Sequence, residues 1–190
     1  MEDSSSKNII AFLSLIGRLK HIQRTGWVLC GVDQPESVAG HMYRMAMMTF
    51  LVDGHDKLNK SRCMELALVH DVAECIVGDI TPHCGVTQEE KHKREKAAML
   101  ELAKLVGSSG NYLLQLYQEY EEQSSGEAQF VKDLDRFDMV LQAFEYEKSS
   151  VNSLDLQQFF DTTEGKFKHP LVTSLVSELN KERSEFHSNK

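Results

Sequence analysis

The sequence predicts an all-α fold in a single domain of about eight helices. The chain has 190 residues, 41% of them hydrophobic, so it can bury one sizeable core but is short for two independent domains. It contains only three prolines, and strand-like alternation is scarce. Segment after segment places apolar residues three and four positions apart, which is the spacing of one helix face. We expect the domain to span residues 8–183, with flexible termini at 1–7 and 184–190.

Each predicted helix follows from its own pattern, taken in chain order. The first two lie on either side of a turn-rich stretch around residues 23–36, and the third is apolar almost all round, as central helices are. Capping-box patterns open two later helices, at Thr87-x-x-Glu90 and at Ser124-x-x-Glu127. The last begins with a proline at an opening position. The predicted helices cover residues 7–22, 37–52, 60–77, 88–106, 112–123, 125–148, 154–163 and 170–183.

Composition and charge exclude several classes of function. The net charge of −8 and the pI near 5.5 disfavour nucleic-acid binding, which needs a concentrated basic surface. No apolar run approaches the roughly 20 residues of a membrane span, and the chain does not open like a signal peptide. We therefore expect an intracellular, cytoplasmic protein without a membrane partner. The four cysteines form no Cys-x-x-Cys pair, so we interpret them as reduced thiols.

The most informative segment places ionisable residues inside an apolar helix. His70 and Glu74 are one helical turn apart, and Asp71 lies beside both, so the three side chains can converge on one point. Imidazole and carboxylate groups together form a ligand set for transition metals. The alternative is that His70 and Asp71 form a polar pair in the core while Glu74 lies on a solvated face.

Two further residues of the same chemistry lie on apolar helix faces elsewhere in the chain. His41 lies among Met45 and Met48, and Asp135 lies beside Leu134. Taken singly, such a histidine is more often a core residue, and such an aspartate more often a surface charge. One bound cation would satisfy both, because each supplies a donor atom that metals accept.

The order His41, His70-Asp71, Asp135 resembles the HD superfamily of metal-dependent phosphohydrolases, helical bundles in which these four residues bind one divalent cation. The similarity covers roughly residues 8–183 and extends to one branch of the family. The segments that resemble the 5′-deoxynucleotidase branch are Arg24-Thr-Gly-Trp27, Pro35-Glu-Ser-Val38, His70-Asp-Val-Ala-Glu74 and Val77-Gly-Asp79. The resemblance implies hydrolysis of deoxyribonucleoside 5′-monophosphates (dAMP, dCMP, dGMP, dTMP) with manganese, cobalt, magnesium or zinc as cofactor.

The resemblance also implies roles for residues around the cation. Glu74 would position or deprotonate the attacking water, or protonate the departing sugar oxygen. With Asp79 and the backbone carbonyl of Ile80, it would form a second cation site. Asp79 could instead bind the sugar 3′-hydroxyl, or be a simple turn residue. One departure is Gly40, because the residue before the first metal histidine is usually acidic in this branch. We expect the metal site to survive there with altered affinity.

Three residues are candidates for substrate binding. The resemblance implies that Arg24 binds phosphate, for which the guanidinium fork is suited. It also implies that Trp27 packs on the sugar face and so disfavours ribose, although a single tryptophan could equally be a core anchor. Lys132, one turn before Asp135, could reach a phosphate, but a lysine near a helix start is usually solvated.

Other functions fit less well but stay open. A guanosine tetraphosphate hydrolase would carry an acidic residue in place of Cys75, and cyclic-nucleotide phosphodiesterases have a larger two-metal ligand set. The remaining alternatives are a general nucleotidase and a non-catalytic protein that binds metal and nucleotide. Similar proteins are dimers, so we expect a homodimer, in which the apolar helices of residues 112–148 could supply the partner face.

Overall fold

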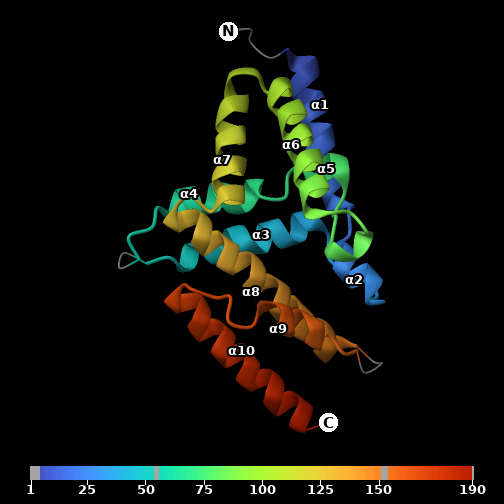
Figure 1. Cartoon of the computed structure of the whole chain (residues 1–190), viewed down its shortest axis with the longest axis vertical. Coiled ribbons are helices and arrows are strands. Elements are labelled where there is room, and N and C mark those ends of the chain that lie inside the picture. Colours follow the sequence, from blue (N-terminus) through green and yellow to red (C-terminus); the bar gives the residue numbers. More distant parts are fainter. Residues whose placement is uncertain (1–4, 54–55, 151–153, 190) are drawn as a thin grey trace.

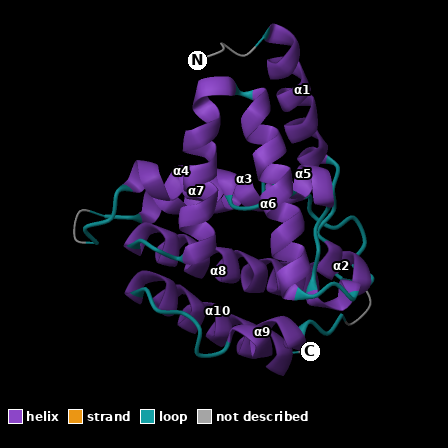
Figure 2. Cartoon of the chain, turned by 45° about the horizontal axis from the view of Figure 1, so that its top comes forward, coloured by secondary structure: helices purple, strands orange, loops and turns teal. Residues whose placement is uncertain are grey.

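A computed structural model describes residues 5–53, 56–150 and 154–189, and within them the prediction of an all-α fold is confirmed. Figure 2 shows helices joined by loops, and the only extended pairing in the described residues is a bridge between Gln23 and Ser37. The α-helices are α1 (Ser6–Gly17), α2 (Thr25–Leu29), α3 (Val38–Met48), α4 (Lys60–Val69), α5 (Glu74–Val77), α6 (Gln88–Leu105), α7 (Gly110–Glu122), α8 (Gly126–Ser149), α9 (Gln157–Thr163) and α10 (Pro170–Ser188).

The helices form three tiers (Figure 1). In the middle tier α3, α4 and α8 all pack against one another. Above it stand α1, α6 and α7, of which α6 packs on α7 and α7 reaches down to α4 and α8. Below it lie α9 and α10, both packed on α8. The middle tier is therefore covered on two sides, which removes its side chains from water.

The apolar faces of the helices meet in one large core. The α3 residues Val38, Met42 and Met45 are at most 5% exposed, and they join fully buried residues of α4 and α8 such as Leu66 and Leu134. A side chain of this size stabilises the fold by about 1.5 to 3 kcal/mol when it is fully buried. The packing of this core sets the positions of the three middle helices, which carry two of the four predicted metal ligands and lead directly into the other two.

The long helix predicted over residues 60–77 is wrong in one respect, because the chain turns in its middle. Helix α4 ends at Val69, residues 70–73 form turns, and α5 begins at Glu74. Two amide groups in this stretch, those of Val72 and Glu74, donate to carbonyls three residues back, which tightens the backbone relative to an α-helix. Periodicity misses such a break, because the flanking residues remain apolar.

Glycine ends α5 for a conformational reason. Gly78 has φ +76° and ψ 170°, a region that is accessible only to a residue without a Cβ atom. The chain thereby reverses directly after α5 and brings Asp79 toward the start of α2. There the side chain of Asp79 accepts a hydrogen bond from the amide of Thr25 at 2.7 Å.

Three other expectations need correction or extension. The stretch around residues 23–36, expected to be irregular, contains α2. Helix α8 is capped by Ser125, which accepts from the amide of Ala128, and not by Ser124 as the capping-box pattern indicated. The side chain of Glu127 accepts instead from the amide of Asn59. Helix α10 continues to Ser188, beyond the domain end that we placed at residue 183. Of the expected flexible termini, residues 1–4 and 190 lie outside the described part of the chain.

Candidate metal centre

The four predicted metal ligands come together at the junction of α3, α4 and α8. His41 projects from α3, His70 and Asp71 follow α4 directly, and Asp135 projects from α8. The His41, His70 and Asp71 donor atoms lie within 4.8 Å of one another. Asp135 joins them through His41, since its Oδ1 is 3.3 Å from His41 Nε2. Residues 94 positions apart in sequence thus face one small volume.

The hydrogen bonds of the two histidines direct their Nε2 atoms to the centre. The Nδ1 atom of His70 lies 2.9 Å from the carbonyl of Ala67, which can only accept, so this nitrogen carries the proton. In His41 the Nδ1 atom lies 2.7 Å from Asp138 Oδ2. The Nε2 atoms of both rings are buried without a hydrogen-bond partner. A lone pair that faces carboxylates without a partner fits a cation ligand, and the ring orientation is typical of metal-bound histidine.

The carboxylates around the centre attract positive charge. Burial and Arg24 both favour the neutral ring of His41, yet the adjacent carboxylates of Asp135 and Asp138 raise its pKa to about 9. Burial favours the neutral form of Asp71, but the neighbouring His70 and His41 lower its pKa below the ordinary value. The donor set of two imidazoles and two carboxylates therefore fits a divalent transition metal.

The second oxygen of Asp135 is held by two donors. Tyr120 Oη and Lys132 Nζ each lie 2.8 Å from Asp135 Oδ2, and Lys132 Nζ also lies 3.1 Å from Tyr120 Oη. Lys132 therefore lies at the centre, with a third of its side chain exposed. These contacts orient Asp135 so that its Oδ1 faces His41.

Glu74 lies beside the centre and is buried. It is only 3% exposed, and its Oε2 atom has no hydrogen-bond partner. Burial first, and then the charges of Asp71 and Asp79, raise its pKa well above the ordinary value. The alternative of a solvated face is therefore wrong for Glu74.

The proposed second cation site is not assembled in the same way. Among the described residues, the groups of three or more side chains close enough to share an ion contain neither Glu74 nor Asp79. One oxygen of Asp79 accepts from the Thr25 amide, and its backbone carbonyl accepts from the Thr25 hydroxyl at 2.7 Å. Asp79 thus joins the start of α2 to the segment that follows α5. Ile80, whose carbonyl completed the expected site, is buried.

Arg24 and Trp27 flank the start of α2 but point to different surroundings. Arg24 Nη1 lies 3.4 Å from Asp71 Oδ2, so the guanidinium faces the metal centre. Trp27 is 1% exposed and packs in a separate cluster against Tyr146 and Phe159. So little exposed surface leaves the indole ring almost nothing to offer a sugar in this structure. The alternative of a core anchor describes its position.

The glycine that departs from the family pattern lies at the exposed start of α3. The amide of Gly40 donates to the hydroxyl of the helix cap Ser37, and an added Cβ would lie at an ordinary 3.5 Å from that hydroxyl. Packing therefore leaves room for a side chain. An acidic residue here would complete a capping box with Ser37, since it would stand three positions after the cap.

Sequence reasoning missed the residues that support the ligands. Asp138 is fully buried and accepts from His41, and Arg44 in turn donates through Nε to Asp138 Oδ1 and through Nη1 to Glu145 Oε2. One signal was present, because Asp138 follows Asp135 by three positions and so lies on the same helix face. Tyr120 had no such signal, since its residue spacing is typical of an ordinary core aromatic.

An all-α bundle whose middle helices present two histidines and two aspartates to one buried point is the arrangement of an HD-domain protein. A family model described as HD domain matches residues 16–173. The chain belongs to the HD-domain family.

Comparisons with individual proteins agree. The chain is 52% identical over 185 residues to the 5′-deoxynucleotidase HDDC2 of Bos taurus, covering 97% of this chain and 90% of the relative. It is also 52% identical to the protein of that name in Homo sapiens, over 94% and 88% of the two chains. Among solved structures, a conserved hypothetical protein from Pyrococcus furiosus superposes with a TM-score of 0.74 at 29% identity, covering 90% of this chain and 99% of that one. None of the helices described in our chain is long and apolar enough to cross a membrane.

Proposed function

We propose that this protein is a metal-dependent 5′-deoxynucleotidase that hydrolyses deoxyribonucleoside 5′-monophosphates to deoxynucleoside and phosphate. The observation that carries the proposal is the pair of buried, unpartnered Nε2 atoms of His41 and His70, which face the carboxylates of Asp71 and Asp135. Relatives of about half-identical sequence bear the name 5′-deoxynucleotidase, which supports the choice of substrate.

His41, His70, Asp71 and Asp135 would hold the cation. When bound, a divalent cation supplies Lewis-acid polarisation of a phosphoryl oxygen and acidifies water. Arg24 faces the same point and binds the phosphate, since its fork matches two phosphoryl oxygens. Lys132 lies within reach as a further phosphate ligand. For Asp79 we propose one of two roles. It either forms a second cation site with Glu74 and the Ile80 carbonyl, or it binds the sugar 3′-hydroxyl.

Glu74 is the proposed acid–base group. In the hydrolysis a water oxygen bonds to phosphorus, the bond from phosphorus to the sugar O5′ breaks, and O5′ takes a proton. The raised pKa of Glu74 favours its protonated form, which suits it to give that proton to O5′. The preference for deoxyribose rests on the relatives' names, because the ring of Trp27 is not accessible to a sugar.

The experiment that tests the proposal is phosphate release by metal-stripped protein resupplied with manganese, cobalt, magnesium or zinc. Matched pairs, dAMP with AMP and dCMP with CMP, report the sugar preference as a ratio of kcat/KM. A ratio near one for both pairs would identify a general nucleotidase. No release with any metal would favour a non-catalytic protein that binds metal and nucleotide.

A first prediction concerns the metal itself. Asp71→Asn should remove bound metal and activity together, because it takes one charged ligand from the set. Metal at about 100 times its Kd should stabilise the wild type by about 2.7 kcal/mol, or about 5 to 10 °C in Tm, and the variant should lose this rise. Metal analysis and thermal melts check it, with the exposed Asp33→Asn as control. Full metal content in Asp71→Asn would show that the site is misassigned.

We also propose that the protein is a homodimer, with a different face from the one expected. In α7 and α8 most large apolar side chains are buried, and among those described only Tyr112 is strongly exposed. The outer face of α3 and the turn after it instead expose an apolar stripe. The α3 stripe consists of Tyr43, Met47, Phe50 and Leu51, each between 48% and 65% exposed.

A further inference from the structure

The inward face of α6 changes from apolar to ionisable side chains toward the start of the helix. Its later positions Ala98, Met99 and Leu102 are buried core residues. The same stripe continues toward the helix start with Glu95 and then Lys91, one turn apart. Glu95 is 7% exposed, and the residues between the two, 92–94, are exposed. Two ionisable residues thus occupy positions where this helix otherwise buries apolar groups.

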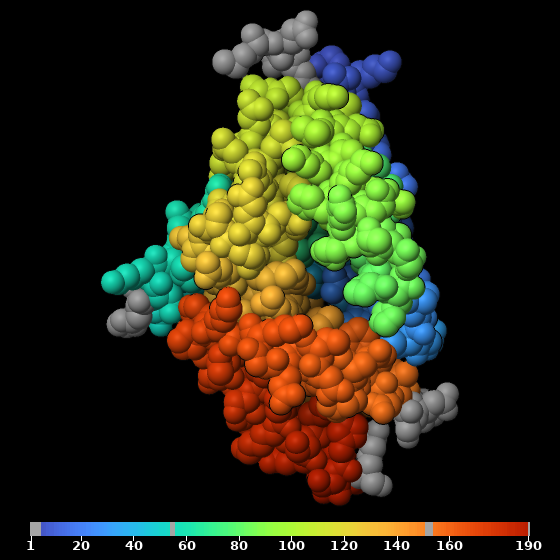
Figure 3. Space-filling view, viewed as in Figure 1, coloured from blue at the N-terminus to red at the C-terminus, as the bar shows by residue number. Residues whose placement is uncertain are grey.

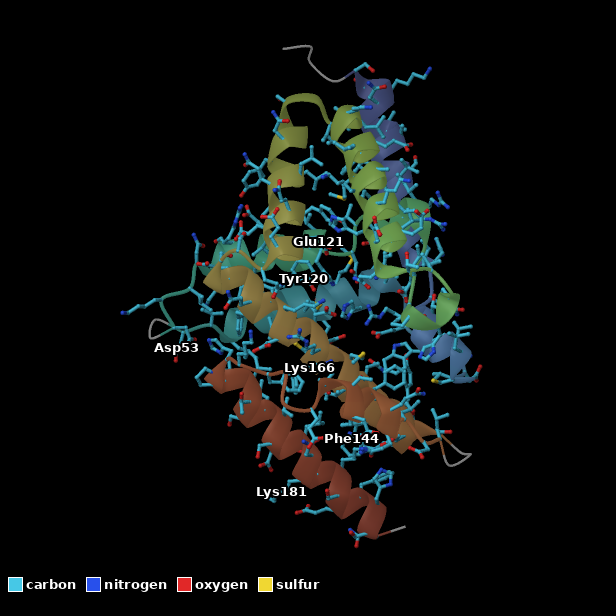
Figure 4. All side chains as sticks on the ribbon, in the orientation of Figure 1. Asp53, Tyr120, Glu121, Phe144, Lys166 and Lys181 are labelled. Carbon is cyan, nitrogen blue, oxygen red and sulfur yellow. The ribbon has the colours of Figure 1, made fainter. Side chains whose placement is uncertain are left out.

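Helix α6 packs against two elements that carry residues in or beside the metal centre. It packs on α5, which begins with Glu74. On the other side His92 Nδ1 lies 3.2 Å from Glu121 Oε2 on α7. Glu121 directly follows Tyr120, whose hydroxyl donates to the predicted ligand Asp135. Figure 4 shows Tyr120 and Glu121 at the lower end of α7, and in Figure 3 the surface is hollowed between α6, α7 and α8.

Glu95 holds the ammonium group of Lys91 in this position. Lys91 Nζ lies 3.5 Å from Glu95 Oε1, and 29% of the lysine side chain remains exposed. Burial alone would lower the pKa of Lys91, but the charge of Glu95 raises it, and so do those of Glu74 and Asp71. Lys91 in turn acts on Glu74, where it opposes the rise in pKa. The ammonium group is therefore charged, partly accessible and within the electrostatic reach of the centre.

The other two cations at the centre come from different elements. Arg24 precedes α2 and lies against Asp71, while Lys132 of α8 is occupied by Asp135 and Tyr120. A phosphate monoester carries up to two negative charges, and at this centre it would lie close to four carboxyl groups. Hydrogen bonds from cationic side chains to its oxygens would offset the repulsion between these groups. Lys91 is the cation that α6 contributes, and it forms an ion pair with a carboxylate of its own helix, Glu95.

We propose that Lys91 is a further substrate-binding residue, whose ammonium group contacts the phosphoryl oxygens, and that Glu95 is the positioning residue that holds it there. This inference rests on the proposed function for the identity of the substrate.

The test uses inorganic phosphate, the reaction product, as the probe of the metal-loaded protein. Calorimetry should show that Lys91→Gln binds phosphate about 10- to 100-fold more weakly than wild type, the loss expected for one hydrogen bond to a charged group. The KM for dAMP should rise by a similar factor, and kcat should fall less. Lys93→Gln, on the exposed side of the same helix turn, is the matched control and should leave both unchanged.

Two further variants separate binding from structure. Lys91→Arg keeps the charge and should retain most of the phosphate affinity, which a purely structural role would not require. Glu95→Gln should weaken phosphate binding less than Lys91→Gln does. Unchanged phosphate affinity in Lys91→Gln would overturn the inference. This holds even if the pH profile of kcat changes in that variant. If the wild type binds phosphate through Lys91 but hydrolyses no nucleotide, the proposed function fails while the phosphate contact stands.

Discussion

At the scale of single residues, the surroundings of Glu74 are the most informative in the molecule. A carboxyl group that is 3% exposed and has an oxygen without a hydrogen-bond partner is costly to bury. Such a cost is typical of groups whose shifted pKa serves catalysis. The nearby carboxyl group of Asp71 differs from Glu74, because it faces both histidines and its pKa lies below the ordinary value. The pKa values of two carboxyl groups three positions apart are thus shifted in opposite directions, as in acid–base pairs of other hydrolases.

The second prediction follows from this contrast. Glu74→Gln keeps the size and hydrogen bonding of the side chain but cannot transfer a proton. We expect kcat to fall by about 10²- to 10⁴-fold, the usual contribution of a positioned acid–base group, while metal content and Tm stay near wild type. Steady-state kinetics with dAMP check this, with the exposed Glu101→Gln of α6 as control. Near-normal kcat would exclude Glu74 from proton transfer.

At the scale of elements, α10 is attached to the rest of the fold through a buried charge. Glu147 of α8 is 1% exposed and accepts from Arg183 Nε at 2.7 Å and Nη2 at 2.8 Å. It also accepts from the amide of Leu156 at 3.0 Å, and His187 Nε2 lies 3.1 Å away. One carboxylate therefore joins α8, the start of α9 and α10. A group with this many donors is costly to remove, because the buried amide of Leu156 and the largely buried guanidinium of Arg183 lose their acceptor.

The third prediction is a pH dependence of stability. Burial favours the neutral form of Glu147, but the hydrogen bonds from Arg183 and Leu156 lower its pKa below the ordinary value. A depressed folded-state pKa stabilises the fold above the unfolded value of about 4.3, and this stabilisation is lost as the pH falls through the folded pKa.

Urea unfolding of wild type and Glu147→Gln from pH 7 to pH 3 measures this effect. We expect a difference in free energy of unfolding of about 1.5 to 3 kcal/mol that is constant above about pH 5 and shrinks below about pH 4. The exposed Glu101→Gln should show no such change. A difference that grew on acidification would contradict the assignment.

At the scale of the whole molecule, α3 presents two different faces. Its inner face carries His41 into the metal centre, and its outer face carries the α3 stripe. The stripe follows i, i+4, i+7 and i+8 spacing, so its members lie side by side on one surface. A two-fold axis beside such a face pairs it with its own copy, which makes the contact self-complementary. Dimer formation would also support the helix that holds His41.

The last prediction tests this contact. Wild-type protein should have the mass of a dimer in light scattering at micromolar concentration, and Met47→Glu should be a monomer, because the two-fold axis brings two new charges into an apolar contact. Ile10→Glu places the same charge on α1, where the apolar side chain is 64% exposed, and should remain a dimer. A monomeric wild type, or a dimer that survives Met47→Glu, would exclude the α3 stripe as the interface.

Local pattern was enough for much of this protein. Helical periodicity predicted the all-α class and seven of the long elements within a few residues, because each amphipathic helix buries one face. The order of His41, His70-Asp71 and Asp135 singled out residues that the fold then brings together, since buried ionisable groups on apolar faces need a common partner.

Tertiary structure decided what depends on groups distant in the chain. The break at residues 70–73 is short, and the start of α2 is held by contacts such as that between Thr25 and Asp79, which are 54 positions apart. The burial of Trp27 depends on Tyr146 and Phe159, which spacing along the chain does not associate with it. Likewise, only packing showed that Lys91 is partly buried beside Glu95 while Lys93 is exposed. Periodicity records which face of a helix is apolar, but the neighbour that covers this face is set by the whole fold.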